Sequence, residues 1–181
     1  MRRRDEAEFE DFARARSEEL MRAAILLTGE RTAAEDLVQS TLTRAYVKWG
    51  RIQAAGNPVA YVRTMQTRLF LDGVRRRSSR ELPVAHLPET RVSARNPEHD
   101  LQRDVVLREA LLVALRELEP VDRAIVVHRY LLDSDVTSVA AELGLTPQAV
   151  RSRASRALAR VRAALGADVH VATDTRREDA G

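Results

Sequence analysis

Residues 136–162 read VTSVAAELGLTPQAVRSRASRALARVR, and this stretch decides how the whole chain is interpreted. A single glycine, Gly144, separates two segments with helical periodicity, and glycine readily takes the positive φ that a tight turn between helices needs. Thr146 is a good N-cap, and Pro147 suits the first position of the helix that follows. The pattern therefore predicts a helix-turn-helix, with LGLT as its turn.

The second helix of this motif is predicted to have two different faces. When residues are placed at 100° steps, the apolar ones fall in a stripe roughly 100° wide. The opposite side carries short or forked polar groups, which suits a helix that enters the DNA major groove with its N-terminal turns. An ordinary helical hairpin with a solvated arginine face is the alternative. The predicted DNA-binding residues are Gln148, Arg151, Ser152, Arg153, Ser155 and Arg156.

The composition limits the class of protein. The chain has 181 residues, with 30 basic and 27 acidic side chains, and Lys48 is its only lysine. Arginine forks onto phosphates and guanine edges, so this composition suits nucleic-acid binding. GC-rich codon usage would also raise the arginine and alanine content, and this alternative stays open. The absence of cysteine excludes a disulfide framework and a thiolate zinc site.

The chain carries no sequence signal for a membrane. Its start, MRRRDEAEFEDF, has arginines without an apolar run behind them, so it is not a signal peptide. No stretch reaches the length of about 18 apolar residues that a spanning helix needs. We therefore expect a cytoplasmic protein.

The rest of the chain shows helical segments around one irregular stretch. Apolar residues recur at helical spacing over 9–27, TAAE from Thr32 to Glu35 is a capping box for a helix that ends at Gly50, and Pro58 opens another helix. Residues 79–104 contain three prolines and nine charges, which is typical of a flexible linker. We predict an all-α fold with two small helical domains of variable separation. The predicted parts are residues 1–78, the linker 79–104, residues 105–166 closed by Gly166, and a disordered tail 167–181.

Two blocks of the chain resemble one known family. Residues 115–165, from LRELEP to VRAAL, resemble region 4 of the extracytoplasmic-function sigma factors of bacterial RNA polymerase. AAEDLVQSTLTRAYVKW (33–49) resembles their region 2.2, and NPVAYVRTMQTRLFLDGVRRRSS (57–79) resembles regions 2.3 and 2.4. The combination looks most like the SigE-like actinobacterial branch. The resemblance covers about residues 5–165 and includes two separate motifs in the right order.

The resemblance implies a transcription initiation factor of two domains. The first domain would bind the β′ clamp helices of core RNA polymerase and open the −10 promoter element. The second would lie on the β flap and read the −35 element. The implied partners are core RNA polymerase, promoter DNA and, as a candidate, an anti-sigma factor. The resemblance implies no cofactor, no metal and no small-molecule substrate.

The resemblance also assigns residues of the first domain. Asp36, Gln39 and Thr43 match the exposed face of region 2.2 and would bind polymerase; a merely soluble face is the alternative. Tyr61 could stack on a flipped base, although an isolated tyrosine is more often part of a core. The arginines near the end of the helix could grip phosphates or simply complement the helix dipole. The residues assigned to the −10 element are Asn57, Tyr61, Arg63, Gln66, Thr67, Arg75, Arg76 and Arg77.

Two other functions, a free-standing DNA-binding regulator and an enzyme, fit the sequence less well. A free-standing helix-turn-helix regulator usually dimerises to match two half-sites. The chain shows no heptad seam, and that function leaves residues 32–49 without a role. An enzyme is also disfavoured, because no histidine has a partner at catalytic or metal-ligand spacing and no Gly-rich phosphate loop occurs. The four histidines are His86, His99, His128 and His170.

Overall fold

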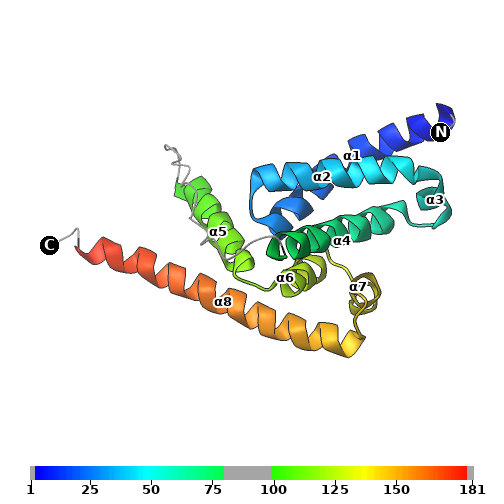
Figure 1. Ribbon diagram of the computed structural model, residues 1–181. Helices are drawn as coiled ribbons and strands as arrows, with labels where there is room; N and C mark the ends of the chain where they lie inside the picture. The colour runs from blue at the N-terminus through cyan, green and yellow to red at the C-terminus, as the bar shows by residue number, and fades with distance from the viewer. Residues whose placement is uncertain (1–2, 80–98, 179–181) are drawn as a thin grey trace.

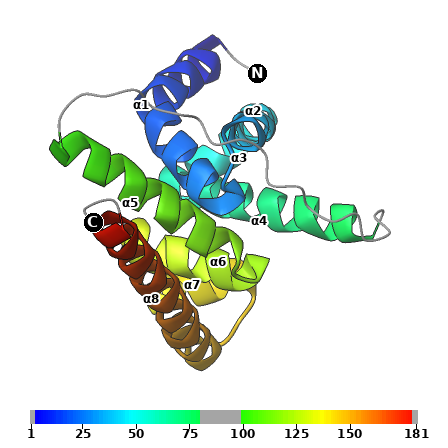
Figure 2. The ribbon, with the colours of Figure 1, turned by 90° about the vertical axis from the view of Figure 1, so that its left-hand side faces the viewer.

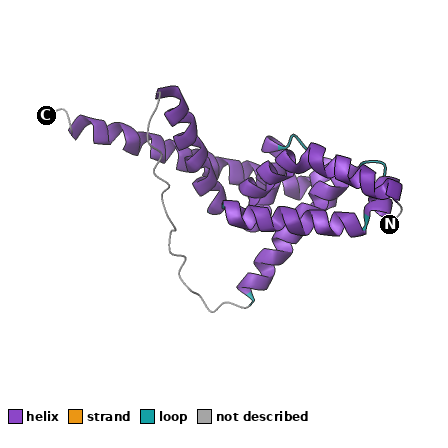
Figure 3. Ribbon diagram, turned by 90° about the horizontal axis from the view of Figure 1, so that it is seen from above, coloured by secondary structure: helices purple, strands orange, loops and turns teal. Residues whose placement is uncertain are grey.

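The computed structural model describes residues 3–79 and 99–178 of the chain (Figure 1). No strand occurs within these two ranges, which confirms the all-α prediction (Figure 3). The elements are α1 (Arg3–Thr28), α2 (Arg31–Val47), α3 (Trp49–Ala54), α4 (Pro58–Ser78), α5 (His99–Arg116), α6 (Pro120–Val126), the π-helical turn η1 (Val127–Leu131), α7 (Val136–Leu143) and α8 (Pro147–Glu178).

Helices α1 to α4 form the first domain. Phe9 and Phe12 of α1 pack on Trp49, with ring centroids 5.3 and 5.0 Å apart, so aromatic contacts close one end of the bundle. Pro58 occupies the first turn of α4, as predicted, and the Asn57 side chain caps the helix by accepting a hydrogen bond from the Ala60 amide at 3.1 Å.

The start and end of α2 differ from the prediction. The helix begins at Arg31, and no side chain caps it, so the capping box predicted from Thr32 to Glu35 is wrong. Instead, Arg31 donates to Glu35 at 2.9 Å. Gly29, at φ +74°, ends α1 and turns the chain directly into the next helix. Gly50 does not end the helical region either, because it lies inside the short helix α3.

Helices α5 to α8 form the second domain, and α7 and α8 make the predicted helix-turn-helix. Gly144 has φ +67° and ends α7, while the Leu145 amide donates to the Ala140 carbonyl at 2.9 Å. Thr146 caps α8 by accepting a hydrogen bond from the Ala149 amide at 3.1 Å. The two helices pack on α6 around a buried apolar cluster of Ile125, Val139, Ala140, Val150 and Ala154.

Two predicted boundaries of the second domain are also wrong. Helix α5 begins at His99, so the last six residues assigned to the linker are helical, while residues 80–98 lie outside the described residues. Helix α8 continues past Gly166 to Glu178. A glycine in a helix interior costs only about 1 kcal/mol relative to alanine, which is too little to stop a helix whose neighbours favour it.

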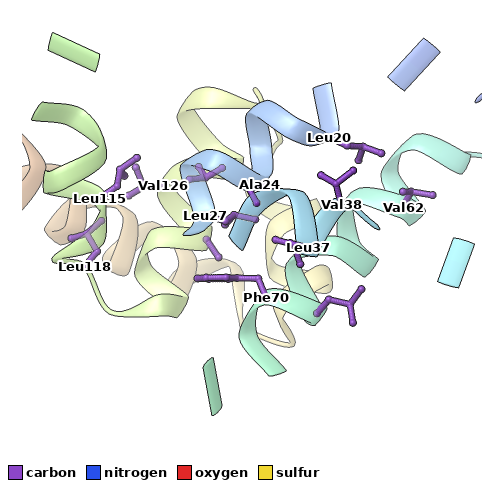
Figure 4. Close-up of a cluster of buried hydrophobic side chains, with 14 of the residues drawn as sticks. Leu20, Ala24, Leu27, Leu37, Val38, Val62, Phe70, Leu115, Leu118 and Val126 are labelled. Atoms are coloured by element: carbon purple, nitrogen blue, oxygen red, sulfur yellow. The ribbon is translucent and has the colours of Figure 1, made fainter. Parts of the chain in front are cut away.

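The two domains are packed against each other. Leu27 of α1 and Phe70 of α4 lie in the same buried cluster as Leu115, Leu118 and Val126 of the second domain (Figure 4). The structure therefore differs from the expected picture of two bodies held apart by a linker. Both domains present apolar side chains that water would otherwise contact, and burying that surface stabilises the docked arrangement.

Arg123 of α6 strengthens this contact between domains. Its guanidinium donates to the Leu27 carbonyl of α1 at 2.7 Å and to the Arg116 carbonyl at 2.7 Å, and it lies 5.7 Å from the centre of the Phe70 ring. Burial lowers the pKa of Arg123, as does the nearby charge of Arg116. A cation at the end of α1 also complements the helix dipole.

Candidate nucleic-acid and polymerase interfaces

The first turns of α8 present an exposed polar face. The apolar residues behind it are held by α6 and α7, so the orientation of the helix is fixed by the buried cluster of the helix-turn-helix. The first turns of α8 follow α7 at the periphery of the fold (Figure 1). Five of the six residues predicted to bind DNA are on this face and exposed: Gln148, Arg151, Ser152, Ser155 and Arg156.

The sixth predicted residue, Arg153, is positioned differently. Its side chain is half-buried, and Nε lies 2.6 Å from Oδ1 of Asp122 in α6. Such a charge-assisted hydrogen bond joins α8 to α6 and occupies one edge of the guanidinium. Arg153 therefore holds the helix in place in this structure, whereas its neighbours Arg151 and Arg156 point toward solvent.

The side chains predicted to bind polymerase lie along a groove of the first domain. Asp36, Gln39 and Thr43 are all exposed on α2. Together with the end of α4 they line a groove of about 470 Å³ whose wall includes Leu69, Phe70 and Gly73. Arg76 and Arg77, which the sequence assigns to DNA, line the same groove. The structure thus brings two predicted sites together on one surface.

The two ends of α4 present predicted −10 residues in different ways. Asn57 is exposed, but its side chain is used as the helix cap. Tyr61 is half-buried and packs against the central apolar cluster, as the core alternative predicts. Residues 75–77 are exposed in the last turn, on a part of α4 that projects from the body of the molecule (Figure 2). Three arginines there suit both phosphate binding and dipole compensation.

The middle of α4 turns its predicted residues inward. Gln66 is 1% exposed and donates to the Leu20 carbonyl at 3.0 Å. Thr67 is also 1% exposed and contacts the second domain. Arg63 is half-buried and donates through Nε to Glu19 at 2.6 Å. Although burial alone would raise it, the pKa of Glu19 is lowered by hydrogen bonds and charge from Arg63 and Arg16.

His128 and Glu142 lie against the middle of α4. Neither residue was assigned to a site from the sequence. His128, 1% exposed in η1, places Nε2 2.6 Å from the Thr67 hydroxyl. Its Nδ1 lies 3.2 Å from Oε2 of Glu142 in α7. Burial, with a contribution from the charge of Arg63, lowers the pKa of His128 to about 4, so the ring is neutral at pH 7. No short motif signals either residue, because their partners lie more than sixty residues away in the sequence or on another helix.

The described residues offer no metal centre. Among them, no group of three histidine, cysteine, aspartate or glutamate side chains could hold a metal ion. None of the helices in that part of the chain combines the length and apolar character needed to cross a membrane.

Solved structures share this arrangement of helices. The sigma factor RpoE of Bartonella quintana, solved in complex with the anti-sigma factor NepR, aligns with a TM-score of 0.68 and 24% identity over 89% of this chain and 98% of that one. CnrH, solved with the cytosolic domain of CnrY, aligns with a TM-score of 0.63 and 20% identity over 90% of each chain. At these identities the comparison establishes the fold.

Sequence comparison establishes the family. Residues 12–80 match the family model of Sigma-70 region 2, and residues 108–161 match Sigma-70, region 4. The RNA polymerase sigma-E factor of Streptomyces coelicolor is 33% identical over 155 residues, which cover 86% of this chain and 84% of that protein. The sigma factor SigE of Mycolicibacterium smegmatis is 32% identical over 82% of this chain and 58% of that protein. The chain therefore belongs to the sigma-70 family, in its extracytoplasmic-function branch.

Proposed function

We propose that the chain directs RNA polymerase to specific promoters by reading their −35 and −10 elements. The observation that carries this proposal is the exposed polar face of α8, built on a helix-turn-helix in a chain that also contains Sigma-70 region 2. Arg151 and Arg156 are spaced to reach base edges or phosphates in a major groove, and Ser152 and Ser155 are short enough to allow close approach. This face is the proposed −35 reader.

The groove between α2 and α4 is the proposed polymerase contact. Asp36, Gln39 and Thr43 form its polar side, and Leu69 and Phe70 supply apolar surface deeper in the groove. A mixed surface of this kind suits a protein partner, since apolar contacts supply affinity while charges set orientation. Family resemblance points to the β′ clamp helices as the occupant. An anti-sigma factor is a further proposed partner, because a sigma factor of this fold, RpoE of Bartonella quintana, was solved with the anti-sigma factor NepR.

The proposed −10 reader lies along α4. Asn57 and Tyr61 lie at its start, and residues 75–77 lie at its exposed end. Arg63 and Thr67 lie between them on the inner face of the same helix. Gln66 is assigned to this reader on resemblance alone, since it is buried against α1.

Transcription in vitro tests this function. Core RNA polymerase with the full chain should initiate on a subset of a random promoter library and yield two sequence motifs, one for each reader. Core polymerase alone should not initiate on that subset. If the chain binds DNA but neither binds polymerase nor changes its initiation sites, it acts as a free-standing regulator and the proposed function is wrong.

A further inference from the structure

Gly73 of α4 is a glycine that the backbone of the fold does not require. Gly29, Gly56 and Gly144 have φ values of +74°, +76° and +67°, a conformation that other residues rarely adopt. Gly73 differs from them, because its backbone is helical and it lies in the interior of α4. A glycine there destabilises the helix relative to alanine, so the helix alone favours a side chain at this position.

The packing of the chain does not require this glycine either. A Cβ atom built on Gly73 would meet no heavy atom within 4 Å beyond its own helix backbone and its chain neighbours. A Cβ atom built on Gly29, by contrast, would collide with the Arg116 side chain, whose Cγ would lie only 2.5 Å away. Among the described residues, nothing within the folded chain therefore explains why position 73 lacks a side chain.

Gly73 leaves a notch in the wall of the groove between α2 and α4. Side chains three and four positions apart share one face of a helix, and the residues of α4 that line the groove have this spacing. One row of positions on that face runs through Leu69, Gly73 and Arg77. A second row runs through Phe70, Gly73 and Arg76. Both rows are interrupted at Gly73, so the wall is open there.

The surroundings of the notch favour an apolar group. Leu37 of α2 lines the same groove as Leu69 and Phe70 of α4, and these three side chains keep only 4–8% of their surface exposed. An apolar side chain in the notch would cover what remains of that surface, which is favourable. A polar group placed against it would lose water without gaining a partner, which is costly. The notch therefore fits an aliphatic or aromatic side chain.

We propose that an apolar side chain of the polymerase helix that binds in this groove enters the notch at Gly73. This inference rests on the proposed function, in which the groove is the polymerase contact. A side chain that enters a gap between the side chains of a facing helix fixes how the two helices lie against each other. The missing side chain at Gly73 thus lets the partner approach α4 closely, and it makes Gly73 a determinant of specificity for polymerase.

Binding of the full chain to core RNA polymerase tests the notch when the notch is filled. Gly73→Ala adds one methyl group and Gly73→Leu adds a large side chain, and in the free chain the added Cβ meets no neighbour. We expect the affinity to fall roughly threefold for Gly73→Ala and roughly thirtyfold for Gly73→Leu, because the cost of overpacking an occupied site grows with the added volume. The loss should be the same at low and high salt, since it is steric and salt screens only charges.

The stability of the free chain should change in the opposite direction. Alanine favours a helix interior over glycine, so Gly73→Ala should melt at the same or a higher temperature than wild type while it binds polymerase less tightly. A glycine with a purely structural role would lose stability and affinity together. Gly50 is the matched control, because it is exposed in α3, a Cβ there also meets nothing within 4 Å, and it does not line the groove. Gly50→Ala and Gly50→Leu should leave polymerase affinity unchanged.

The outcomes separate this inference from the proposed function. If wild type binds core polymerase and Gly73→Leu binds equally well, no side chain enters the notch, and the inference is overturned while the proposed function stands. The inference is also overturned if Gly73→Ala melts below wild type, or if Gly50→Leu loses as much affinity as Gly73→Leu. If wild type itself does not bind core polymerase, the proposed function is wrong and the inference falls with it. If circular dichroism shows that Gly73→Leu does not fold, the opposite changes in stability and affinity of Gly73→Ala decide.

Discussion

The two proposed DNA-reading surfaces are presented in opposite ways. The face of α8 is exposed and is held by helices that adjoin it in the sequence. The middle of α4 is covered by η1 and α7, more than sixty residues further along the chain. The first surface is formed entirely within its own domain. The exposure of the second depends on where the other domain lies. The docked chain therefore exposes the proposed −35 reader and covers part of the proposed −10 reader.

Among the substitutions that test this comparison, removal of Arg123 is expected to have the largest effect, which is on the free energy of unfolding. Arg123→Ala leaves the carbonyls of Leu27, Arg116 and Leu118 without their donor and removes a half-buried cation from Phe70. We expect a loss of about 3 kcal/mol in the free energy of unfolding, because three carbonyls, two of them partly buried, lose their donor and the packing on Phe70 is lost at once. Urea unfolding measures it. Arg108→Ala, at an exposed position of α5, should change stability by less than about 0.5 kcal/mol, and an equal effect of the two substitutions would contradict this role.

Low pH should destabilise the folded chain at the covered surface, because His128 is buried there in its neutral form. The folded-state pKa is about 4, below the ordinary value of 6.5, so between these values the unfolded chain binds more protons and stability falls as the pH falls. The full effect is roughly 3 kcal/mol. Glu142 acts in the opposite direction, since its raised pKa makes its contribution more favourable as the pH falls toward 4.5. Denaturation of wild type and His128→Gln from pH 7 to 4.5 should give a steeper loss for wild type; parallel curves would show that the histidine does not titrate with unfolding.

Substitutions of the arginines in the first turns of α8 should have different effects. Arg151→Ala and Arg156→Ala should each weaken −35 binding by roughly 1–3 kcal/mol and relax base preference, if each side chain reads a base. Arg153→Ala should instead lower the free energy of unfolding by about 1 kcal/mol, because it loses its bond to Asp122, and should leave base preference intact. Binding to a duplex library measures both effects. A uniform loss across all sequences would show that Arg151 or Arg156 only holds phosphate.

Substitutions in the groove between α2 and α4 are expected to give the smallest effect, a change in the affinity for core polymerase. Asp36→Arg combined with Gln39→Ala should weaken binding to core polymerase by roughly 1–2 kcal/mol, because a charge is reversed beside Arg76 and Arg77. Binding to −35 duplex should not change. Glu109→Arg on α5 makes an equivalent charge reversal outside the groove and should leave polymerase affinity unaltered. Unchanged affinity in the double variant would separate α2 from the polymerase contact.

The features that the sequence predicted correctly are those with local causes. The turn at Gly144, the cap at Thr146, Pro58 at the start of α4 and the apolar rear of α8 depend on residues within one or two helical turns. The start of α2 was predicted wrongly because two local signals compete there. A capping pattern at Thr32 was present, but the turn made by Gly29 and Thr28 started the helix earlier.

The covered surface could not be predicted from local patterns. Thr67 and Gln66 are polar residues on a helix, and nothing adjacent in the sequence shows that one meets His128 and the other meets α1. The docking of the two domains depends on apolar faces that look like ordinary core positions of each domain. His128 lies in what reads as a plain helix, because a π turn has no simple sequence signature.

The π turn at Val127–Leu131 also adds one residue to the helix that carries His128. Its ladder bond runs from the Leu132 amide to the Val127 carbonyl, so the turn accommodates one more residue than an α-helix would. Deleting one residue there would restore an ordinary helical ladder, and the helix would keep its direction because the π turn had absorbed the extra residue. The residues of the turn would shift by one position, so a single-codon deletion would change which side chain meets Thr67. A change of length in η1 thus acts on the contact between the domains, while the buried cluster behind α8 keeps that helix in place.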